Sequence, residues 1–253
     1  MYTEERRSEI LKHIESDGKV SVEEMADLYG TSRETIRRDL KDLEAKGVLR
    51  RTHGGAIASG ITEYPQQIRG IQNPCEKERI CRKAASFIKD GDTVFIDNST
   101  TCLYIVKFLP PEMHVSIFTN SLRLLTEAAQ SGFANKDFYC LGGNINPSNL
   151  STYNDMDFLK ERNRIFPDKC IISCAGISGQ RKITDGSIFE VATKQMFMEL
   201  SREVILLADH TKFGIEGAYF VDDGSNVDFL ITDAVPEGFA NPLEGNAQII
   251  IAE

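Results

Sequence analysis

Basic side chains recur at helical spacing near the N-terminus. Arg33, Arg37 and Lys41 are four residues apart, so they would share one side of an α-helix while apolar residues occupy the other. Arginine can donate two hydrogen bonds to guanine, a threonine can contact a thymine methyl group, and basic wing residues can reach phosphates. We therefore expect DNA contacts from Ser32, Arg33, Thr35, Arg37, Arg38 and Lys41 on this helix, and from Arg50, Arg51 and His53 after it.

The net charge of −9 over 253 residues argues against DNA binding only if the charge is spread evenly. Residues 31–57 contain seven Lys and Arg but four Asp and Glu, so the basic charge is local. DNA affinity depends on a local basic surface that displaces counterions from phosphates. The acidic remainder of the chain does not exclude this function.

A second set of polar residues follows predicted strands. The loops are Asp97–Thr101, Thr119–Ser121 and Leu141–Asn144, and each lies where a strand ends. Backbone N–H groups and hydroxyls at such positions can hold a phosphate, and open parallel sheets bind ligands at this edge. Each loop alone could consist of ordinary helix caps, but three together predict a shared pocket, for which Lys212 is the best counter-charge.

The elements that position the basic residues form a winged helix-turn-helix over residues 1–57. A first helix is predicted over Glu4–Ser16, and Ser21 with Glu24 is typical of the capping box of a second. Ser32 caps a third helix, Arg33–Lys46, and two short strands, Val48–Thr52 and Gly54–Ile57, form the wing.

The rest of the chain is predicted to be a linker, residues 58–73, and a largely parallel α/β domain, residues 74–253. Helical patterns alternate there with continuously apolar strands, which indicates a sheet covered on both faces. The predicted strands are Thr93–Asp97, Val115–Thr119, Lys136–Leu141, Lys169–Cys174, Glu203–Ala208, Phe229–Thr232 and Gln248–Ala252. The predicted helices run from Pro74 to about residue 90, and over Cys102–Leu109, Leu122–Gln130 and Glu190–Leu200.

Composition indicates a cytoplasmic protein without a membrane span, cofactor or metal. The apolar runs are far shorter than the roughly 20 residues of a membrane span, and the charged N-terminus is unlike a signal peptide. The six scattered cysteines are expected to be reduced, half-buried thiols. Cys170 and Cys174 fall in a predicted buried strand without the spacing of a zinc site.

The N-terminal motifs resemble the DeoR family of bacterial regulators. The resemblance lies in Val20–Ala26, Thr35–Glu44 and Leu49–Ala56. It implies that this domain binds double-stranded operator DNA, usually to repress genes of sugar catabolism.

The resemblance continues over residues 69–252. It lies in Glu76–Ile80, Asp90–Thr93, Thr119–Leu122, Ala175–Ile177 and Ala208–Gly214. It implies an effector domain similar in fold to ribose-5-phosphate isomerases, which senses a phosphorylated sugar. By this resemblance Asp97, Asn98, Ser99, Thr100 and Thr101 hold the phosphate, and the site is lined by Asp97, Asn120, Gly142, Gly143, Asp185 and Lys212.

The sequence departs from the family pattern at three places. Asn98 and Ser99 replace the Ser and Gly of the phosphate loop, and a side chain in place of Gly could alter phosphate binding. Lys182 stands where the family tends to have Gly, and Leu150–Tyr153 also lacks the usual Gly. We therefore expect an atypical effector or a degraded pocket.

Two alternatives remain open from the sequence. An isomerase-like enzyme carrying a DNA-binding module could draw an acid and a base from Asp185, Glu190, Lys194, Asp209, His210 and Lys212, but the isomerase motifs are absent and fold alone confers no activity. The winged helix could instead serve protein contacts. A homo-oligomer, dimer or tetramer, is expected because symmetric homo-oligomers are common among soluble proteins.

Overall fold

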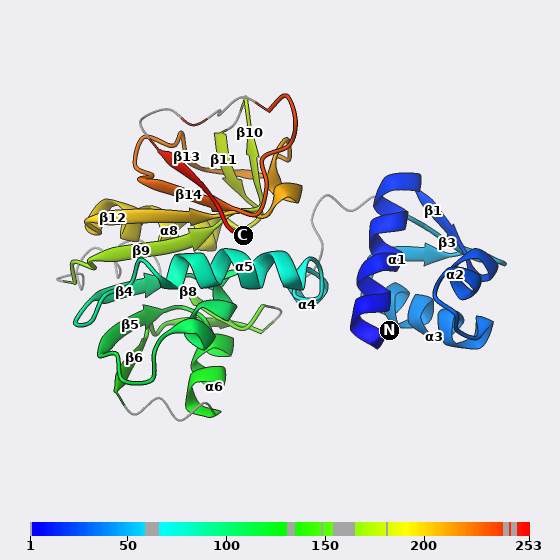
Figure 1. Cartoon of the computed structure of the whole chain (residues 1–253), viewed down its shortest axis with the longest axis horizontal. Helices are drawn as coiled ribbons and strands as arrows, with labels where there is room; N and C mark the ends of the chain where they lie inside the picture. The colour runs from blue at the N-terminus through cyan, green and yellow to red at the C-terminus, as the bar shows by residue number, and fades with distance from the viewer. Residues whose placement is uncertain are drawn as a thin grey trace. The chain divides into compact units, whose positions relative to one another are not determined.

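The computed structural model describes residues 2–58, 66–130, 135–147, 149–153, 165–180, 182–239, 243 and 247–253 (Figure 1). The chain divides into two compact units, Met1–Pro74 and Cys75–Glu253. Each unit has its own buried apolar residues and is described by itself.

The N-terminal unit consists of three helices and a three-stranded antiparallel sheet. The helices are α1 (Thr3–Asp17), α2 (Val22–Leu28) and α3 (Arg33–Ala45), and the strands are β1 (Lys19–Ser21), β2 (Leu49–Arg51) and β3 (Gly55–Ala58), in the order β1-β3-β2. The predicted helices and wing strands are confirmed to within about two residues at each end. Ile36, Leu40 and Leu43 are fully buried, as the helical spacing predicts.

Strand β1 was not predicted from the sequence. Val20 pairs with Ala56 of β3. Ser21 ends the strand and caps α2, since its hydroxyl accepts a hydrogen bond from the Glu24 backbone N–H at 3.5 Å. Three residues are too few for alternation to reveal a strand.

Part of the stretch predicted as a linker is helical. Helix α4 spans Gln66–Arg69, and Ile68 on it is fully buried. Residues 59–65 of the predicted linker lie outside the described residues.

The C-terminal unit is built on a seven-stranded, fully parallel sheet with the order β15-β14-β12-β9-β4-β5-β6. Its strands are β4 (Thr93–Ile96), β5 (Val115–Thr119), β6 (Lys136–Cys140), β9 (Lys169–Ser173), β12 (Glu203–Leu207), β14 (Phe229–Thr232) and β15 (Gln248–Ile251). All seven match predicted strands, which confirms the largely parallel α/β domain.

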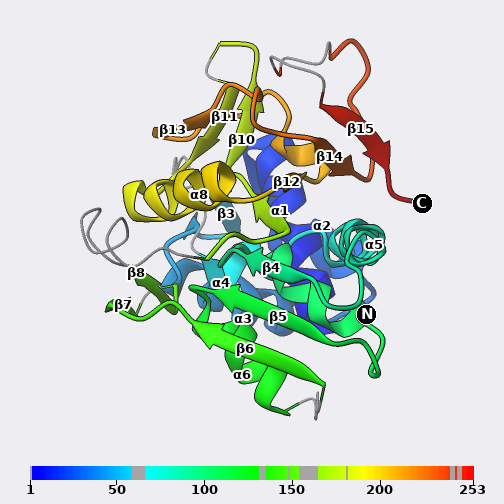
Figure 2. The same ribbon diagram turned by 90° about the vertical axis from the view of Figure 1, so that its left-hand side faces the viewer.

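Both faces of the sheet are covered at its centre, so the central strands β4, β9 and β12 are almost entirely buried, whereas the edge strands β6 and β15 are partly exposed. Helix α5 (Pro74–Ala85) packs on one face with the buried side chains of Val94 and Ile96. Helix α8 (Ile188–Leu200) packs on the other face with Phe95, whose ring stacks on Phe197 at 3.9 Å between centroids. Figure 2 shows these two helices on opposite sides of the sheet.

The remaining helices of this unit differ from the prediction in one end point and in helix type. Helix α5 ends at Ala85, earlier than the Asp90 expected, and α6 spans Leu122–Gln130 as predicted. The segment after β4 forms a 3-10 helix, η1 (Cys102–Phe108), in place of an α-helix, and a second one, η2, spans His210–Lys212. No helix of the described residues is long and apolar enough to cross a membrane.

Two small antiparallel elements were not predicted from the sequence. One is a sheet of β10 (Gly176–Ser178), β11 (Lys182–Asp185) and β13 (Tyr219–Asp222), and the other a hairpin of β7 (Asn144–Asn146) and β8 (Ser151–Tyr153). These strands have three or four residues, too few to show a period of two. Both elements lie beside the loops at the carboxyl edge of the main sheet.

Candidate DNA interface and effector site

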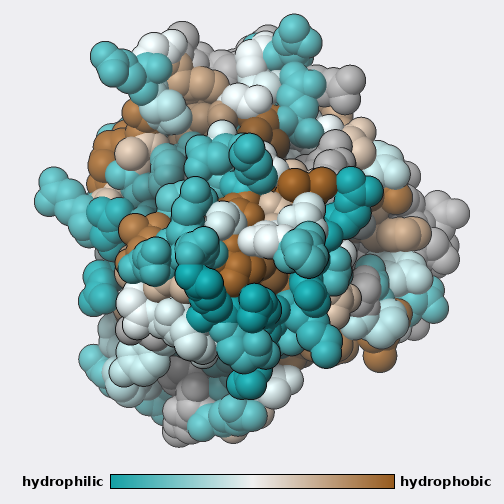
Figure 3. All heavy atoms as spheres, turned by 90° about the vertical axis from the view of Figure 1, so that its right-hand side faces the viewer, coloured by the Kyte–Doolittle hydropathy of each residue, from teal (hydrophilic) through white to brown (hydrophobic). Residues whose placement is uncertain are grey.

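The predicted DNA-contacting side chains lie on the surface of α3 and the wing. Ser32 is the N-cap of α3 and accepts a hydrogen bond from the Thr35 N–H at 3.1 Å, and the two hydroxyls are 2.8 Å apart. Thr35 is half-buried, whereas the other eight predicted contacts are exposed, namely Ser32, Arg33, Arg37, Arg38, Lys41, Arg50, Arg51 and His53. Figure 3 views this unit and shows a mainly hydrophilic surface around small hydrophobic patches.

The exposed cations are available to a polyanion. Arg33 pairs with Glu23, and the Arg37 guanidinium lies 3.6 Å from the Glu34 carboxylate. Exposed pairs of this kind contribute about 0–1 kcal/mol and are readily exchanged for phosphate contacts. Arg38 and Lys41 form no ion pair with any residue that the structure describes.

A buried ion-pair network fixes α3 to α1. Asp39 is 2% exposed, and its two oxygens accept from Arg6 Nε at 2.6 Å and Arg7 Nε at 2.9 Å. Arg7 also pairs with Asp42. This network could not be predicted from the sequence, because its members are about 33 positions apart and no periodicity links them. It holds the inner face of α3 so that the outer face is presented rigidly.

A close backbone approach shapes the wing. An added Cβ on Gly55 would lie 1.9 Å from the Val20 carbonyl oxygen, so β1 and β3 can pair only with glycine there. The neighbouring Gly54 has open space at the same position. Glycine at 55 therefore sets the position of β3, with which β2, the strand of Arg50 and Arg51, is paired.

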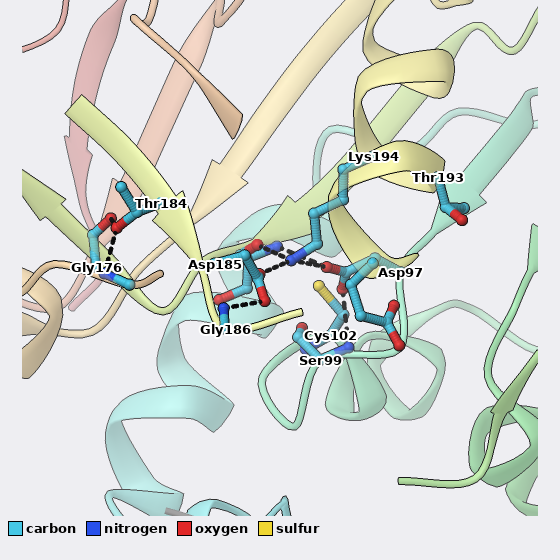
Figure 4. Close-up of polar contacts among 12 residues, drawn as sticks. Asp97, Ser99, Cys102, Gly176, Thr184, Asp185, Gly186, Thr193 and Lys194 are labelled. Carbon is cyan, nitrogen blue, oxygen red and sulfur yellow. Dashed lines mark hydrogen bonds and ion pairs between the residues drawn. The ribbon is translucent and has the colours of Figure 1, made fainter. Parts of the chain in front are cut away.

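The predicted phosphate loop follows β4 and is organised by Asp97. This side chain is 1% exposed; one oxygen accepts from the Ser99 N–H at 3.0 Å and the other from the Ser173 N–H at 3.1 Å. The Ser99 hydroxyl accepts from the Cys102 N–H at 3.1 Å (Figure 4). Ser99 does not adopt a positive φ, so serine fits this glycine position of the family without backbone strain.

Lys194 of α8 lies at the centre of a buried charge cluster behind this loop. Its ammonium group is 3.2 Å from Asp97, donates to the Ser173 carbonyl at 2.6 Å and pairs with Asp185 (Figure 4). Burial alone would lower the pKa of Lys194, but the two carboxylates raise it above its ordinary value. The lysine therefore stays charged and ties β4, β11 and α8 together.

A second buried lysine, Lys77 of α5, reaches the loop directly. Its ammonium group donates to the Thr100 hydroxyl at 3.3 Å. Burial would raise the pKa of Asp209, but Lys212, Thr211 and Lys77 lower it below its ordinary value. Lys77 was not among the predicted site residues. It lies on the same face of α5 as Ile80 and Ala84, and a lysine on an apolar helix face is expected to have a buried partner.

Asn120 connects the end of β5 to α8 and to the β8 hairpin. Its side-chain N–H donates to Glu190 at 3.0 Å, and Asn149 donates to the other oxygen of Glu190 at 3.1 Å. Asn98 in turn donates to the Asn149 carbonyl at 3.2 Å. Asn149, which the sequence analysis overlooked, therefore joins the loops after β4 and β5.

The remaining predicted residues are distributed around this cluster. Gly142 and Gly143 are exposed beyond the end of β6, whereas Asp185 is buried against Lys194. Of the residues considered for catalysis, His210 pairs with Asp233 at 2.7 Å and not with the cluster. The described residues include no group of His, Cys, Asp and Glu side chains that could hold a metal ion.

The cysteines are only partly as expected. Cys170 and Cys174 are buried, as the strand prediction requires, and burial raises the pKa of Cys174 to about 12. Cys75 and Cys140 are exposed, not half-buried. All six are free thiols.

Two of the departures from the family pattern fall at left-handed backbone positions. Lys182 has φ of 57° and Leu150 has φ of 53°. These conformations cost a side-chain-bearing residue about 1–2 kcal/mol, which glycine avoids. Glycine would adopt these two conformations without that cost.

Comparison with protein families assigns both units. A model of the DeoR C terminal sensor domain matches residues 72–234, and a model of the DeoR-like helix-turn-helix domain matches residues 6–61.

Similar proteins extend over most of the chain. The HTH-type transcriptional regulator IolR of Bacillus subtilis is 34% identical over 83% of this chain and 82% of its own. The HTH-type transcriptional repressor GlcR of the same species is 32% identical over 100% and 98%, and the glycerol-3-phosphate regulon repressor of Escherichia coli is 32% identical over 92% and 91%. Ribose 5-phosphate isomerase A of Neisseria gonorrhoeae aligns with a TM-score of 0.39 at 13% identity, over 54% of this chain and 52% of that one, a likeness too low to assign anything.

Proposed function

Since the chain belongs to the DeoR family of helix-turn-helix transcriptional regulators, we propose that it represses carbohydrate-metabolism genes under the control of a phosphorylated sugar. The N-terminal unit binds double-stranded operator DNA, and the effector binds the C-terminal unit. Relatives named as repressors, GlcR and the glycerol-3-phosphate regulon repressor, support the sign of regulation.

The exposed basic face of α3 carries the DNA-binding part of the proposal. Arg33, Arg37, Arg38 and Lys41 are exposed on a helix whose opposite side is anchored through Asp39. This arrangement suits insertion into the major groove, with the wing cations on the backbone.

The Asp97–Thr101 loop carries the effector part. It lies at the carboxyl edge of a parallel sheet, where ligands bind in open α/β folds. Lys77 contacts the loop at Thr100, so a cation is present to offset a phosphate in an otherwise acidic unit.

Control of DNA binding requires the effector to bind two arrangements of the protein with different affinity. We propose that a homo-oligomer, dimer or tetramer, holds two winged helices over repeated half-sites and that the effector changes their spacing. Lys194 is the residue best placed to transmit the change, because it joins the loop to α8.

Operator binding is tested by selecting duplexes from a random DNA pool with the full chain. We expect enrichment of a repeated half-site and a steep loss of affinity as salt rises. No enrichment together with salt-independent binding would favour a winged helix that serves protein contacts.

Effector binding is tested by thermal unfolding of the full chain with a panel of hexose, pentose and polyol phosphates. A ligand at 100 times its Kd stabilises the native state by about 2.7 kcal/mol and raises Tm. The same ligand should change operator affinity. A panel without any shift and with unchanged operator affinity would refute the phosphosugar effector.

An enzymatic role is not supported by the relatives, which are named as transcriptional regulators and repressors. The candidate acid and base groups are also engaged within the protein, since Asp185 pairs with Lys194 and His210 with Asp233. We therefore assign the C-terminal unit a sensing role.

A further inference from the structure

A row of exposed cations lies on the outer side of α5. Arg79 precedes Arg82 by three residues and Lys83 by four, so the three side chains share one side of the helix, and all three are exposed. The opposite side, with Ile80 and Ala84, is buried against the sheet. Figure 1 and Figure 2 show α5 on the outside of the C-terminal unit. The three charges therefore face outward together.

Lys107 of the 3-10 helix η1 extends this row. The Arg82 guanidinium lies 4.6 Å from the centre of the Phe108 ring, so the exposed surfaces of α5 and η1 are continuous. The neighbouring Lys107 is exposed, and its ammonium group lies 4.9 Å from the centre of the Tyr104 ring. The α5 basic face is defined by these four cations, Arg79, Arg82, Lys83 and Lys107.

The charges of the α5 basic face are not balanced locally. None of its four cations forms an ion pair with a residue that the structure describes. Glu78 is the one exposed acid of α5, and η1 contains no acidic residue. Contact with an aromatic ring positions a cation but leaves its charge in place. The face therefore carries a net positive charge in a chain whose net charge is −9.

Unbalanced cations of this kind fit a polyanion, because the release of counterions from phosphates favours their binding. Helix α5 begins at Pro74, where the N-terminal unit ends. At 1.5 Å per helical residue, Arg79 and Lys83 are only about 8 and 14 Å further along α5. A duplex held by the N-terminal unit would keep its flanking phosphates at a high effective concentration for such a nearby face.

We propose that the α5 basic face is a second DNA-contacting surface, which binds the phosphate backbone of the duplex that flanks the operator. This inference rests on the proposed operator binding by the N-terminal unit. The contacts are made to phosphates alone, so they add affinity without any preference for the sequence of the flank.

The experiment measures the affinity of the full chain for a short and a long duplex by fluorescence anisotropy. The short duplex contains only the half-sites selected from the random pool, and the long one is extended by about 20 base pairs at each end. Two unrelated flank sequences are used. We expect the long duplexes to bind about tenfold more tightly than the short one at low salt, and equally with either flank.

A variant that combines Arg79→Gln, Lys83→Gln and Lys107→Gln should remove this gain. Its salt slope on the long duplex should be shallower by about 2.7 units, or 0.9 for each lost phosphate contact, while its affinity for the short duplex stays within about twofold. The three side chains are exposed, so thermal unfolding should be unchanged.

Two control proteins accompany this variant. A combination of Arg79→Lys, Lys83→Arg and Lys107→Arg keeps the three charges and should keep the gain, because phosphate contacts depend on charge. Arg202→Gln removes a cation that is 80% exposed and follows α8, the helix on the other face of the sheet, so it should bind both duplexes like the unchanged protein.

The outcomes separate this inference from the proposed function. If no duplex is selected or bound, the proposed operator binding fails, and the inference fails with it. If the operator binds but the flanks add no affinity, or the glutamine variant keeps the full gain, the second DNA contact is refuted while operator binding stands. The α5 basic face would then be available to an acidic protein surface. A loss of the gain in Arg202→Gln as well would also refute the assignment to this face.

Discussion

Individual residues divide helix α3 into an exposed face, which we propose contacts DNA, and a buried face that holds the fold. Arg37 and Arg38 are adjacent in sequence to Asp39, yet the arginines are exposed and the aspartate is buried between Arg6 and Arg7. Helical geometry accounts for the difference, since successive residues rotate by about 100° around the axis. Substitutions at neighbouring positions therefore test different properties.

Arg37→Ala should weaken binding to the selected operator by about 1–3 kcal/mol if the guanidinium contacts a base. Its exposed pair with Glu34 at 3.6 Å contributes little to stability, so the fold should be unaffected. Affinities for operator and random duplexes are measured in parallel. Lys12→Ala, an exposed lysine of α1, is the control, and equal losses on both duplexes would mean that Arg37 contacts phosphate.

Asp209 should make the C-terminal unit sensitive to acid. Although burial would raise its pKa, Lys212, Thr211 and Lys77 lower it below the ordinary value of about 4. A lowered native pKa adds stability above the unfolded pKa, and that contribution is lost as pH falls through the native value. Asp209→Asn should therefore flatten the decline in unfolding free energy below about pH 4 in urea titrations. Parallel curves for both proteins would contradict this.

At the scale of elements, short strands and close approaches decide where the functional loops lie. Strand β1 has three residues, but it places Val20 against Gly55 and so fixes the wing. The hairpin β7–β8 likewise positions Asn149 and Thr152 over the ends of β4 and β5.

Gly55→Ala should destabilise the wing by about 1–3 kcal/mol, because the new methyl would meet the Val20 carbonyl oxygen at 1.9 Å and the strands must separate. Operator affinity should fall with it. Hydrogen exchange at the amides of β1 and β3 reports the local opening. Gly54→Ala, with open space around its Cβ, should leave both measurements unchanged, and similar effects of the two substitutions would refute the steric explanation.

The sequence predicted long or strongly patterned elements and missed those that depend on distant partners. The central strands of the main sheet were found because they are largely apolar runs, as burial on both faces requires, whereas the edge strand β6 is mixed and mostly exposed. Strand β11 was missed because Lys182–Asp185 has only four residues, too few to show a period of two, although its partner β10 lies close by in the sequence. The same limit applies to the site: Asp97 and Asn120 stand out at strand ends, whereas the contacts of Lys77 and Asn149 arise only from folding.

At the scale of the whole molecule, we propose that an acidic chain binds DNA through a small basic area. The net charge is −9, and residues 58–253 carry −8 of it. Repulsion between the acidic unit and DNA should discourage non-specific binding, so specificity rests on the few exposed cations of α3 and the wing.

Arg50→Ala should reduce the steepness of the salt dependence by about one unit in a plot of log affinity against log salt, since each phosphate contact contributes about 0.9. Arg50 is exposed and forms no ion pair with the described residues, so its charge is available. Affinity should fall equally on operator and random duplexes. Lys89→Ala in the C-terminal unit is the control, and an unchanged slope for Arg50→Ala would exclude a phosphate contact.

The Arg6–Arg7–Asp39 network also sets a rule for engineering new operator preferences. A helix graft that replaces residues 33–45 wholesale would leave two arginines of α1 without their carboxylate, at a cost of several kcal/mol. Retargeting should instead rewrite the outward positions 33, 37 and 41 and retain Asp39. The operator preference of α3 can thus be changed by substituting its outward side chains one at a time, but not by replacing the whole helix.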